Sequence, residues 1–452
     1  MGRSTVSPPR AGNSTSLAGR PRPRFTSRRP PPTVVRMTAP PPNLRIDGQR
    51  LWQSLMAMAE IGATANGGVC RLAASDQDRA ARDRFVAWCR DAGLNVRVDR
   101  LGNIFARRGG RNDALPPVVI GSHLDTQPSG GKFDGAYGVL AAFEVVRTLD
   151  DARIATEAPL EVVVWTNEEG SRFAPACVGS GVYAGVFGVE DCLGRADRDG
   201  KTLGAELARI DYAGPAPMGG PVGAYLEAHI EQGPILEAEG KTIGVVTGAQ
   251  GIRWYDVTLD GQAAHAGTTP MNRRRDALQG AAALVAAIEA IALDRAPSAV
   301  ATVGALRVAP NSRNTIVGSV ALTVDLRHPD AAVLAAMDRA FRDRTAAIAA
   351  QRRLDARIDE VWDFPPPTFD RACVAAVRAA AARAGLSHRD IVSGAGHDAC
   401  YMARIAPTAM VFVPCADGIS HNEIEAATPA DLAAGCAVLL GAVLALAAEV
   451  RG

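Results

Sequence analysis

The chain has 452 residues, 47% of them hydrophobic and 21% charged, which is the balance of an ordinary globular protein with room for two or three domains. A formal net charge of +1 gives no reason to expect nucleic acid as a partner, and no run of eighteen or more uncharged apolar residues predicts a membrane span. The eight cysteines are scattered without a Cys-x-x-Cys pair, which favours buried thiols and a cytoplasmic location over disulfides or a structural zinc site.

Residues 1–46 differ in composition from the rest of the chain. They contain nine arginines and no acidic residue, and they are rich in Pro, Ser and Gly. Such a segment cannot bury a core, so it predicts a disordered tail, and it lacks the apolar stretch of a secretory signal. We expect translation to begin at Met37. The intact mass of the native protein tests this hypothesis, and a mass that includes residues 2–36 would contradict it.

From residue 47 onward, predicted helices and strands alternate. Helical patterns cover residues 51–62, 78–93 and 137–151, and strand patterns cover residues 95–110, 116–126 and 160–170. Continuous apolar strands between helices indicate an α/β domain whose mainly parallel sheet is covered by helices on both faces. In such sheets the ligand crevice lies beyond the carboxyl ends of the strands, and the stretches GSHLDT and NEEG fall at two of these ends.

Residues 249–360 change character. The predicted elements there are strand, helix, strand, strand, helix and strand, at 252–261, 273–295, 299–310, 318–329, 330–353 and 354–362. This βαββαβ order is that of the ferredoxin-like unit. The α/β pattern then resumes, so we predict a discontinuous domain of residues 47–248 and 361–452 that is interrupted by a smaller inserted domain of residues 249–360.

Polar side chains able to bind a metal follow apolar runs in five loops. They are His123 and Asp125, Asp134, Glu168 and Glu169, His229, and His421. Histidines with carboxylates and without thiolates suit zinc, manganese or cobalt. A carboxylate shared between two ions would make a two-metal hydrolytic site.

Each of these residues also has an ordinary interpretation. A lone histidine at a strand end is usually a hydrogen-bonding residue, and Asp134 beside glycines is typical of a turn. His328 and His388 are interpreted as turn or surface residues. Glu168 and Glu169 are harder to explain this way, because two like charges directly after a buried strand repel each other and resist burial.

Seven stretches carry a resemblance to a known family. They are GSHLDTQPSGGKFDGAYG, VVVWTNEEGSRFAPACVGS, EAHIEQGPILE, HAGTTPM, DLRHPD, SGAGHDA and DGISHNE. From about residue 48 onward the chain resembles the N-carbamoyl-amino-acid amidohydrolases, within the larger aminoacylase and carboxypeptidase family of two-metal enzymes. The group contains L-carbamoylases, β-ureidopropionases and allantoate amidohydrolases. The resemblance implies a catalytic domain with an inserted lid and dimerisation domain. It also implies hydrolysis of N-carbamoyl-L-amino acids or N-carbamoyl-β-alanine to the free amino acid, CO2 and ammonia.

The resemblance also implies the metal ligands, which are His123, Asp134, Glu169, His229 and His421. Asp134 would bridge two divalent ions, with zinc expected and manganese, cobalt or nickel as alternatives. Asp125 would orient the His123 imidazole by accepting its other N–H, and Glu168 would act as the general base toward a metal-activated water. The related peptidases carry a carboxylate where this chain has His229, which favours the carbamoylase branch.

Further residues are implied to bind the substrate. Arg327 would hold its carboxylate, since arginine binds carboxylates through two parallel hydrogen bonds. Gln232, Asn314 and His397 would add polar contacts. His265 would donate to the oxyanion of the tetrahedral intermediate, although the small residues around it also allow a buried core histidine. The resemblance implies a homodimer through the inserted domain, domain closure over the substrate, and substrate contacts from the partner subunit.

Other interpretations stay open at the level of sequence. An aminoacylase or metallopeptidase would share the metal chemistry, and a non-catalytic binding protein on the same fold would be expected to have lost ligands or the base. A thiol amidase of the nitrilase type needs a Glu-Lys-Cys arrangement on another fold, which nothing in the sequence suggests. Within the branch, the motifs look closer to β-ureidopropionases and L-carbamoylases than to allantoate enzymes. An α- or a β-amino acid product stays open, because the two place the carboxylate only one carbon apart.

Overall fold

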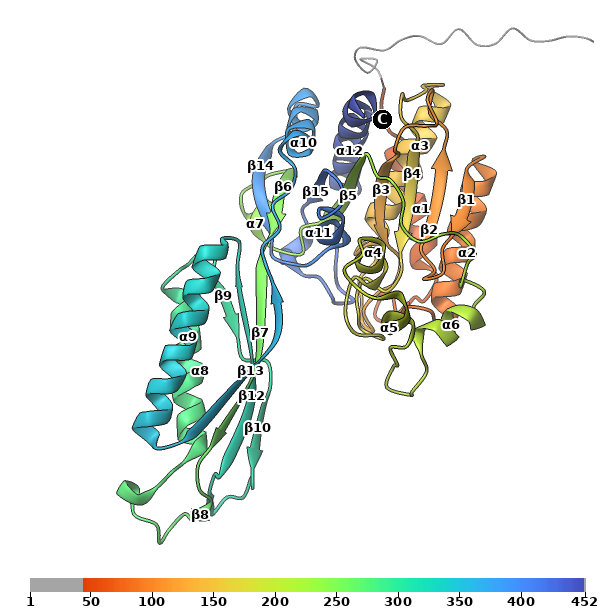
Figure 1. Cartoon of the computed structure of the whole chain (residues 1–452). Coiled ribbons are helices and arrows are strands. Elements are labelled where there is room, and N and C mark those ends of the chain that lie inside the picture. The colour runs from red at the N-terminus through yellow and green to blue at the C-terminus, as the bar shows by residue number, and fades with distance from the viewer. Residues whose placement is uncertain (1–43, 451–452) are drawn as a thin grey trace, which may run out of the picture. The chain divides into compact units, whose positions relative to one another are not determined.

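The computed structural model describes residues 44–450 (Figure 1). The tail predicted over residues 1–46 therefore lies almost entirely outside the described residues. Within the described range, eight strands form one sheet in the order β1-β2-β4-β3-β5-β15-β6-β14. These strands are β1 (Asn95–Val98), β2 (Ile104–Arg108), β3 (Val118–His123), β4 (Leu160–Trp165), β5 (Ala224–Ile230), β6 (Ile243–Ala249), β14 (His388–Ser393) and β15 (Thr408–Val413).

The centre of this sheet is parallel. Strand β3 pairs in parallel with both β4 and β5, and β5 pairs in parallel with β15, whereas β1, β2 and β6 introduce antiparallel pairs. The central strands are buried along their whole length, as expected for strands covered on both faces. The predicted α/β class with a mainly parallel sheet is confirmed.

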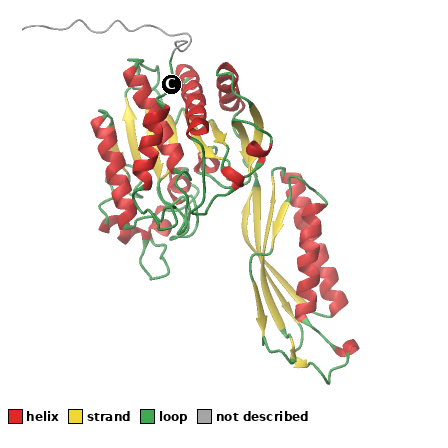
Figure 2. Cartoon of the chain, turned by 180° about the vertical axis from the view of Figure 1, so that it is seen from behind, coloured by secondary structure: helices red, strands yellow, loops and turns green. Residues whose placement is uncertain are grey.

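Four helices pack against one another, and three of them, all but the first, also pack against strands of the sheet; Figure 2 shows the helices and strands of the chain from behind. They are α1 (Gly48–Ala59), α3 (Ala136–Asp151), α10 (Arg371–Arg383) and α12 (Pro429–Glu449), while α2 (Asp76–Asp91) lies against β1. Shorter helices occupy the connections: α4 (Val178–Tyr183), α5 (Val189–Leu193), α6 (Leu203–Arg209), α7 (Ile235–Ala238), α11 (Asp398–Met402) and η2 (Ala416–Gly418).

Helix α12 is the one helix among the described residues that is long and apolar enough to cross a membrane, by length and composition alone. Its apolar residues include Leu432, Val438, Leu439 and Val443, which are buried, and the helix contacts α3, α10 and the central strands. This packing accounts for its apolar composition as that of a core helix.

The inserted segment forms a second, antiparallel sheet with two helices on one face. Its elements are β7 (Gly251–Asp260), α8 (Ala277–Leu293), β9 (Val300–Thr302), β10 (Leu306–Ala309), β12 (Ser319–His328), α9 (Ala331–Arg352) and β13 (Asp355–Phe364). The strand order is β10-β12-β7-β13, with β9 also paired to β12, so the second strand of the predicted βαββαβ unit is split into β9 and β10. The sheet begins at Gly251, inside the predicted range of 249–360, and ends at Phe364, a few residues beyond it.

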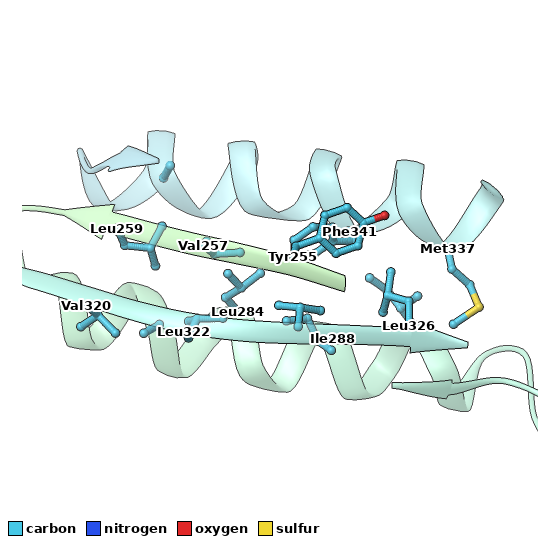
Figure 3. Packing of buried hydrophobic residues seen from close by; sticks show 14 of the residues in the cluster. Tyr255, Val257, Leu259, Leu284, Ile288, Val320, Leu322, Leu326, Met337 and Phe341 are labelled. Atoms are coloured by element: carbon cyan, nitrogen blue, oxygen red, sulfur yellow. The ribbon is translucent and has the colours of Figure 1, made fainter. Parts of the chain in front are cut away.

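A separate hydrophobic core holds this inserted sheet to its helices (Figure 3). Alternate residues of β7, Tyr255, Val257 and Leu259, point toward Leu284 of α8 and Phe341 of α9. A two-stranded ribbon, β8 (Ala264–His265) with β11 (Thr315–Ile316), and the short helix η1 (Met271–Arg273) lie outside this sheet.

Candidate active site and metal centre

The candidate metal ligands follow neighbouring parallel strands. His123 is the last residue of β3, and His229 lies near the end of β5, which pairs with β3. Glu169 follows β4 on the other side of β3, and His421 follows β15, which pairs with β5. Because the carboxyl ends of parallel strands meet at one edge of a sheet, four segments far apart in sequence bring their side chains together there.

Asp134 reaches the same edge from the turn before α3. Gly135, at the N-cap of α3, has a left-handed backbone conformation with φ of 63°. A Cβ at this position would lie 2.3 Å from the His123 ring, so only glycine permits the close approach of the helix to this imidazole.

Asp134 joins two groups of potential ligands. Its Oδ1 lies 3.1 Å from His229 Nε2 and 3.6 Å from His123 Nε2. Its Oδ2 lies 3.3 Å from His421 Nε2, which in turn is 3.4 Å from Glu169 Oε2. Within each three-residue group the candidate ligand atoms lie within 4.8 Å of one another. The two oxygens of one carboxylate therefore face two separate groups, as a carboxylate that bridges two ions must.

Main-chain carbonyls orient two of the imidazoles. His123 Nδ1 lies 2.9 Å from the carbonyl oxygen of Asp125, and His229 Nδ1 lies 2.9 Å from the carbonyl oxygen of Ile230. Since a carbonyl only accepts, each Nδ1 donates, and each Nε2 is directed toward Asp134. This is the arrangement that fixes the ring of a metal-binding histidine.

Asp125 accepts the other N–H of His123, as predicted, but it does so through its main-chain carbonyl oxygen. The carboxylate instead accepts hydrogen bonds from the backbone N–H of Glu168 at 3.3 Å and of Glu169 at 3.2 Å. Asp125 therefore fixes the turn that directs the two glutamates.

The acidic side chains of the site are buried close together. Burial raises the pKa of Glu169 to about 8, with the Asp134 carboxylate adding to the rise. Burial also raises the pKa of Glu168 well above its usual range, and Asp398 contributes next. Burial opposes ionisation of Asp134 as well, but hydrogen bonds with His229 and His421 hold its pKa well below the usual value.

These residues fit divalent cations. Three imidazole nitrogens and the oxygens of Asp134 and Glu169 converge, and none of these donors is a thiolate, which matches the preference of zinc, manganese, cobalt and nickel. Positive charge at this point would also stabilise the buried carboxylates in their ionised form. Glu168, with Oε2 at 3.5 Å from His123 Nε2, lies beside the His123–Asp134–His229 group without being part of it.

Sequence reasoning missed several residues that hold the ligands in place. Gln127 donates to both Glu169 oxygens, from its backbone N at 3.1 Å and its side-chain Nε2 at 2.7 Å. Glu425 Oε1 accepts from the backbone N of Asp134 at 3.1 Å. Cys177 Sγ donates to Glu168 Oε1 at 3.2 Å. Gln127 and Cys177 lie inside the quoted motifs, whereas Glu425 lies two residues beyond DGISHNE and had no signal in the sequence.

A cavity of about 460 Å³ opens beside the two candidate metal-binding groups, His123–Asp134–His229 and Asp134–Glu169–His421. Its polar lining contains the five candidate ligands together with Glu168, Gln232, Arg327 and His397. Arg327 comes from β12 of the inserted sheet, where its guanidinium pairs with Asp325, Nη2 to Oδ2 at 2.8 Å, and donates to the carbonyl of Gly394 at 3.2 Å. The cavity thus brings a cation and the metal-binding groups to one space.

Gln232 and His397 line the cavity, and one nitrogen of each side chain is already hydrogen-bonded. Gln232 Nε2 donates to Asp134 Oδ2 at 3.0 Å and to Ser420 Oγ at 3.1 Å. His397 is buried with its ring against His229, and its Nε2 lies 2.8 Å from Ser393 Oγ. Burial lowers the pKa of His397 well below its usual value, which favours the neutral imidazole.

The structure does not bring His265 and Asn314 to this cavity. Both are exposed, and they lie together on the β8–β11 ribbon, where the N–H of Ala266 donates to the carbonyl of Asn314. Figure 1 draws this ribbon at the end of the inserted sheet opposite the start of β7. His265 Nδ1 accepts from the backbone N–H of Gly267 and Thr268, which leaves Nε2–H as an exposed donor.

Comparison with known proteins identifies the family. The sequence profile of Peptidase family M20/M25/M40 matches residues 119–445. An N-carbamoyl-L-amino-acid amidohydrolase from Rhizobium meliloti is 47% identical over 409 residues, which cover 90% of this chain and 98% of that protein. The chain belongs to the M20/M25/M40 peptidase family.

Within this family it is an amidohydrolase of the hydantoinase/carbamoylase group, as the sequence motifs predicted. The crystal structure of an amidase of the hydantoinase/carbamoylase family from Burkholderia multivorans is 61% identical, with a TM-score of 0.86, and the match covers 90% of this chain and all of that one. An allantoate amidohydrolase from Bacillus subtilis is also 35% identical over 86% of this chain and 95% of its own length. M20 membership implies divalent metal ions, in keeping with the donor groups around Asp134.

Proposed function

We propose that this amidohydrolase cleaves the carbamoyl C–N bond of N-carbamoyl amino acids and releases the free amino acid, CO2 and ammonia. The observation that carries the proposal is the cavity in which the Arg327 guanidinium faces the same space as the metal-binding groups. A substrate with a carboxylate at one end and a ureido group at the other could bind Arg327 through the carboxylate and reach the metal-binding groups with the ureido group. The similarity to the R. meliloti N-carbamoyl-L-amino-acid amidohydrolase supports the same substrate class.

Five residues are proposed as metal ligands. His123, Asp134, Glu169, His229 and His421 would hold two divalent ions, for which we propose zinc, with manganese, cobalt or nickel as alternatives. When bound, these ions supply the Lewis acidity that polarises a carbonyl and activates a water.

Glu168 takes up the proton of the attacking water as the new C–O bond forms, and it then delivers a proton to the leaving nitrogen as the C–N bond breaks. The products are the amino acid and a carbamate, which decomposes to CO2 and ammonia. Burial raises the pKa of Glu168, which favours a carboxylate that takes up a proton and then delivers it. Arg327 holds the substrate carboxylate, and Gln232 and His397 add polar contacts at the cavity wall.

We further propose that His265 and Asn314 act in the cavity of a partner subunit, in a homodimer formed through the inserted domain. Both are exposed on the β8–β11 ribbon, and the free Nε2–H of His265 is the kind of donor that an oxyanion requires. The dimer would be cytoplasmic, in keeping with the free cysteines at the eight positions.

A side-by-side assay of ureido substrates tests the proposal. Purified enzyme is given N-carbamoyl α-amino acids, N-carbamoyl-β-alanine and allantoate, and ammonia and free amine are measured. We expect release from at least one N-carbamoyl amino acid. No release from any N-carbamoyl amino acid would contradict the proposal, and release from allantoate alone would assign the enzyme to the activity named for the B. subtilis relative.

A further inference from the structure

The cavity has an apolar wall beside Arg327, formed by Ile252, Trp254, Trp362 and Phe364. We propose that the preferred substrate is an N-carbamoyl α-amino acid with a large apolar or aromatic side chain, which this wall would bury. This inference rests on the proposed function and narrows its substrate class.

Strand register explains how the wall forms beside Arg327. Residues directly opposite one another in an antiparallel pair point to the same face of the sheet. The register of β12, β7 and β13 gives two adjacent rows on one face, Arg327–Ile252–Phe364 and Asp325–Trp254–Trp362. All of these residues except Asp325 line the cavity. The proposed carboxylate-binding group and the apolar side chains therefore share one surface.

This surface is the face of the inserted sheet opposite its own core. In β7 the odd-numbered residues Tyr255, Val257 and Leu259 are buried against the helices. Ile252 and Trp254 alternate with them and point the other way. Trp254 is 43% exposed although it lines the cavity, so much of its indole is open to a ligand.

A β-bulge in β13 turns the remaining aromatic residues toward the cavity. Glu360 lies opposite Tyr255, and Trp362 lies opposite Trp254, so Val361 is an extra residue in the pairing. In a regular pairing Val361 would lie opposite Trp254, and Trp362 would then turn to the face covered by helices. Bulges commonly redirect a side chain next to a functional site, and here the bulge completes the apolar wall.

The chemistry of the substrate determines which group meets the wall. The α-carbon of an N-carbamoyl amino acid carries the carboxylate, the ureido nitrogen and the side chain. When Arg327 holds the carboxylate and the ureido group lies at the metal-binding groups, the side chain is directed to the rest of the cavity, which is apolar. N-carbamoyl-β-alanine has no side chain to bury there, and the polar substituents of allantoate would lose water without a partner.

A comparison of substrates that differ in their side chains tests the inference. The kcat/KM of the native enzyme is measured with N-carbamoylphenylalanine, N-carbamoylleucine, N-carbamoylglycine and N-carbamoyl-β-alanine. Burial of a large apolar side chain predicts a preference of about 10- to 100-fold for the first two substrates. Equal efficiency with all four would overturn the inference and leave the proposed function standing, whereas no turnover of any of them would contradict the proposed function itself.

Two variants and a control assign the preference to the wall. Trp254→Ala is expected to lower kcat/KM about 10-fold for N-carbamoylphenylalanine and to leave N-carbamoylglycine within about twofold. Trp88 is a half-buried tryptophan of α2 that does not line this cavity. Trp88→Ala should therefore leave kcat/KM unchanged for both substrates. Arg327→Leu should lower kcat/KM by a similar factor for both substrates, because both carry the carboxylate. If Trp254→Ala affected the two substrates equally, or acted by changing the oligomeric state, the wall would not be a side-chain pocket.

Discussion

At the scale of single residues, the adjacent glutamates after β4 have separate partners. Glu169 is held by Gln127 and directs Oε2 toward His421, whereas Glu168 lies beside His123 and accepts from Cys177. The buried pair that looked unfavourable in the sequence is therefore divided between a metal-binding group and a position suited to a base.

This division predicts different effects for the two amide variants. Glu168→Gln is expected to keep its metal and lose about 10²- to 10⁴-fold in kcat, the usual contribution of a general base. Glu169→Gln is expected to lower the metal content, because it removes an anionic ligand. Metal analysis beside steady-state kinetics checks both, with the exposed Glu157→Gln as control. Equal loss of metal in the two variants would refute the division.

Cys177 is predicted to position Glu168. Its backbone N–H donates to the Glu168 carbonyl at 2.7 Å and its thiol donates to the carboxylate, while its own backbone is left-handed with φ of 53°. Cys177→Ala should lower kcat roughly 2- to 10-fold with little change in KM, as expected for a lost weak hydrogen bond. Cys177→Ser, which keeps a donor, should recover most of the rate. If serine behaved like alanine, the hydrogen bond would not matter for turnover.

At the scale of elements, the position of the ligands depends on how closely α3 packs on the sheet. A Cβ on Gly138 would lie 2.4 Å from the carbonyl oxygen of Ala228 and 2.6 Å from Ser122 Cβ, next to His229 and His123 respectively. Gly138→Ala is therefore expected to lower the free energy of unfolding by about 1–3 kcal/mol, the usual cost of overpacking. Urea unfolding measures this. Gly188→Ala, where a Cβ meets nothing closer than 3.8 Å, is the matched control, and an equal effect at both positions would argue against close packing of α3.

Elements with strong patterns were predictable and short ones were not. The long helices have a clear helical period, the buried central strands are continuous apolar runs, and the βαββαβ order of the insert could be recognised from the sequence. Helices α4 to α7 are too short to show a helical period. The bulge at Val361 was also hidden, because an apolar run such as VWDF reads as regular strand until its partner strand is known.

At the scale of the whole molecule, the residues of the candidate site that lie inside the recognised motifs could be predicted from the sequence. The strand ends that carry His123, Glu169 and His229 adjoin because β4, β3 and β5 are neighbours in a parallel sheet. Contacts between distant segments were not predictable, such as Glu425 with the turn at Asp134 or the carboxylate of Asp125 with the glutamate turn. The distance of His265 from the cavity lining depends on the length and direction of the inserted sheet, which motif spacing does not encode.

The proposed dimer gives a prediction for mixed subunits. If His265 acts in the partner's cavity, His265→Ala and Arg327→Leu homodimers should both be nearly inactive. A mixed dimer would then contain one intact site, and random mixing should restore about a quarter of the native activity. Activity is measured after the two variants are unfolded and refolded together, with each variant refolded alone as control. Failure to recover activity, although mixed dimers are detected by mass, would place His265 in the site of its own subunit or outside catalysis.

The central claim is that hydrolysis depends on divalent ions held by the groups that share Asp134, and metal titration tests it most directly. The enzyme is stripped with a chelator, its residual metal is quantified by mass spectrometry, and zinc is added back while the hydrolysis of its best N-carbamoyl substrate is followed. We predict a rate near zero without metal and recovery that saturates at about two ions per chain. A full rate in protein shown to be free of metal would contradict the account.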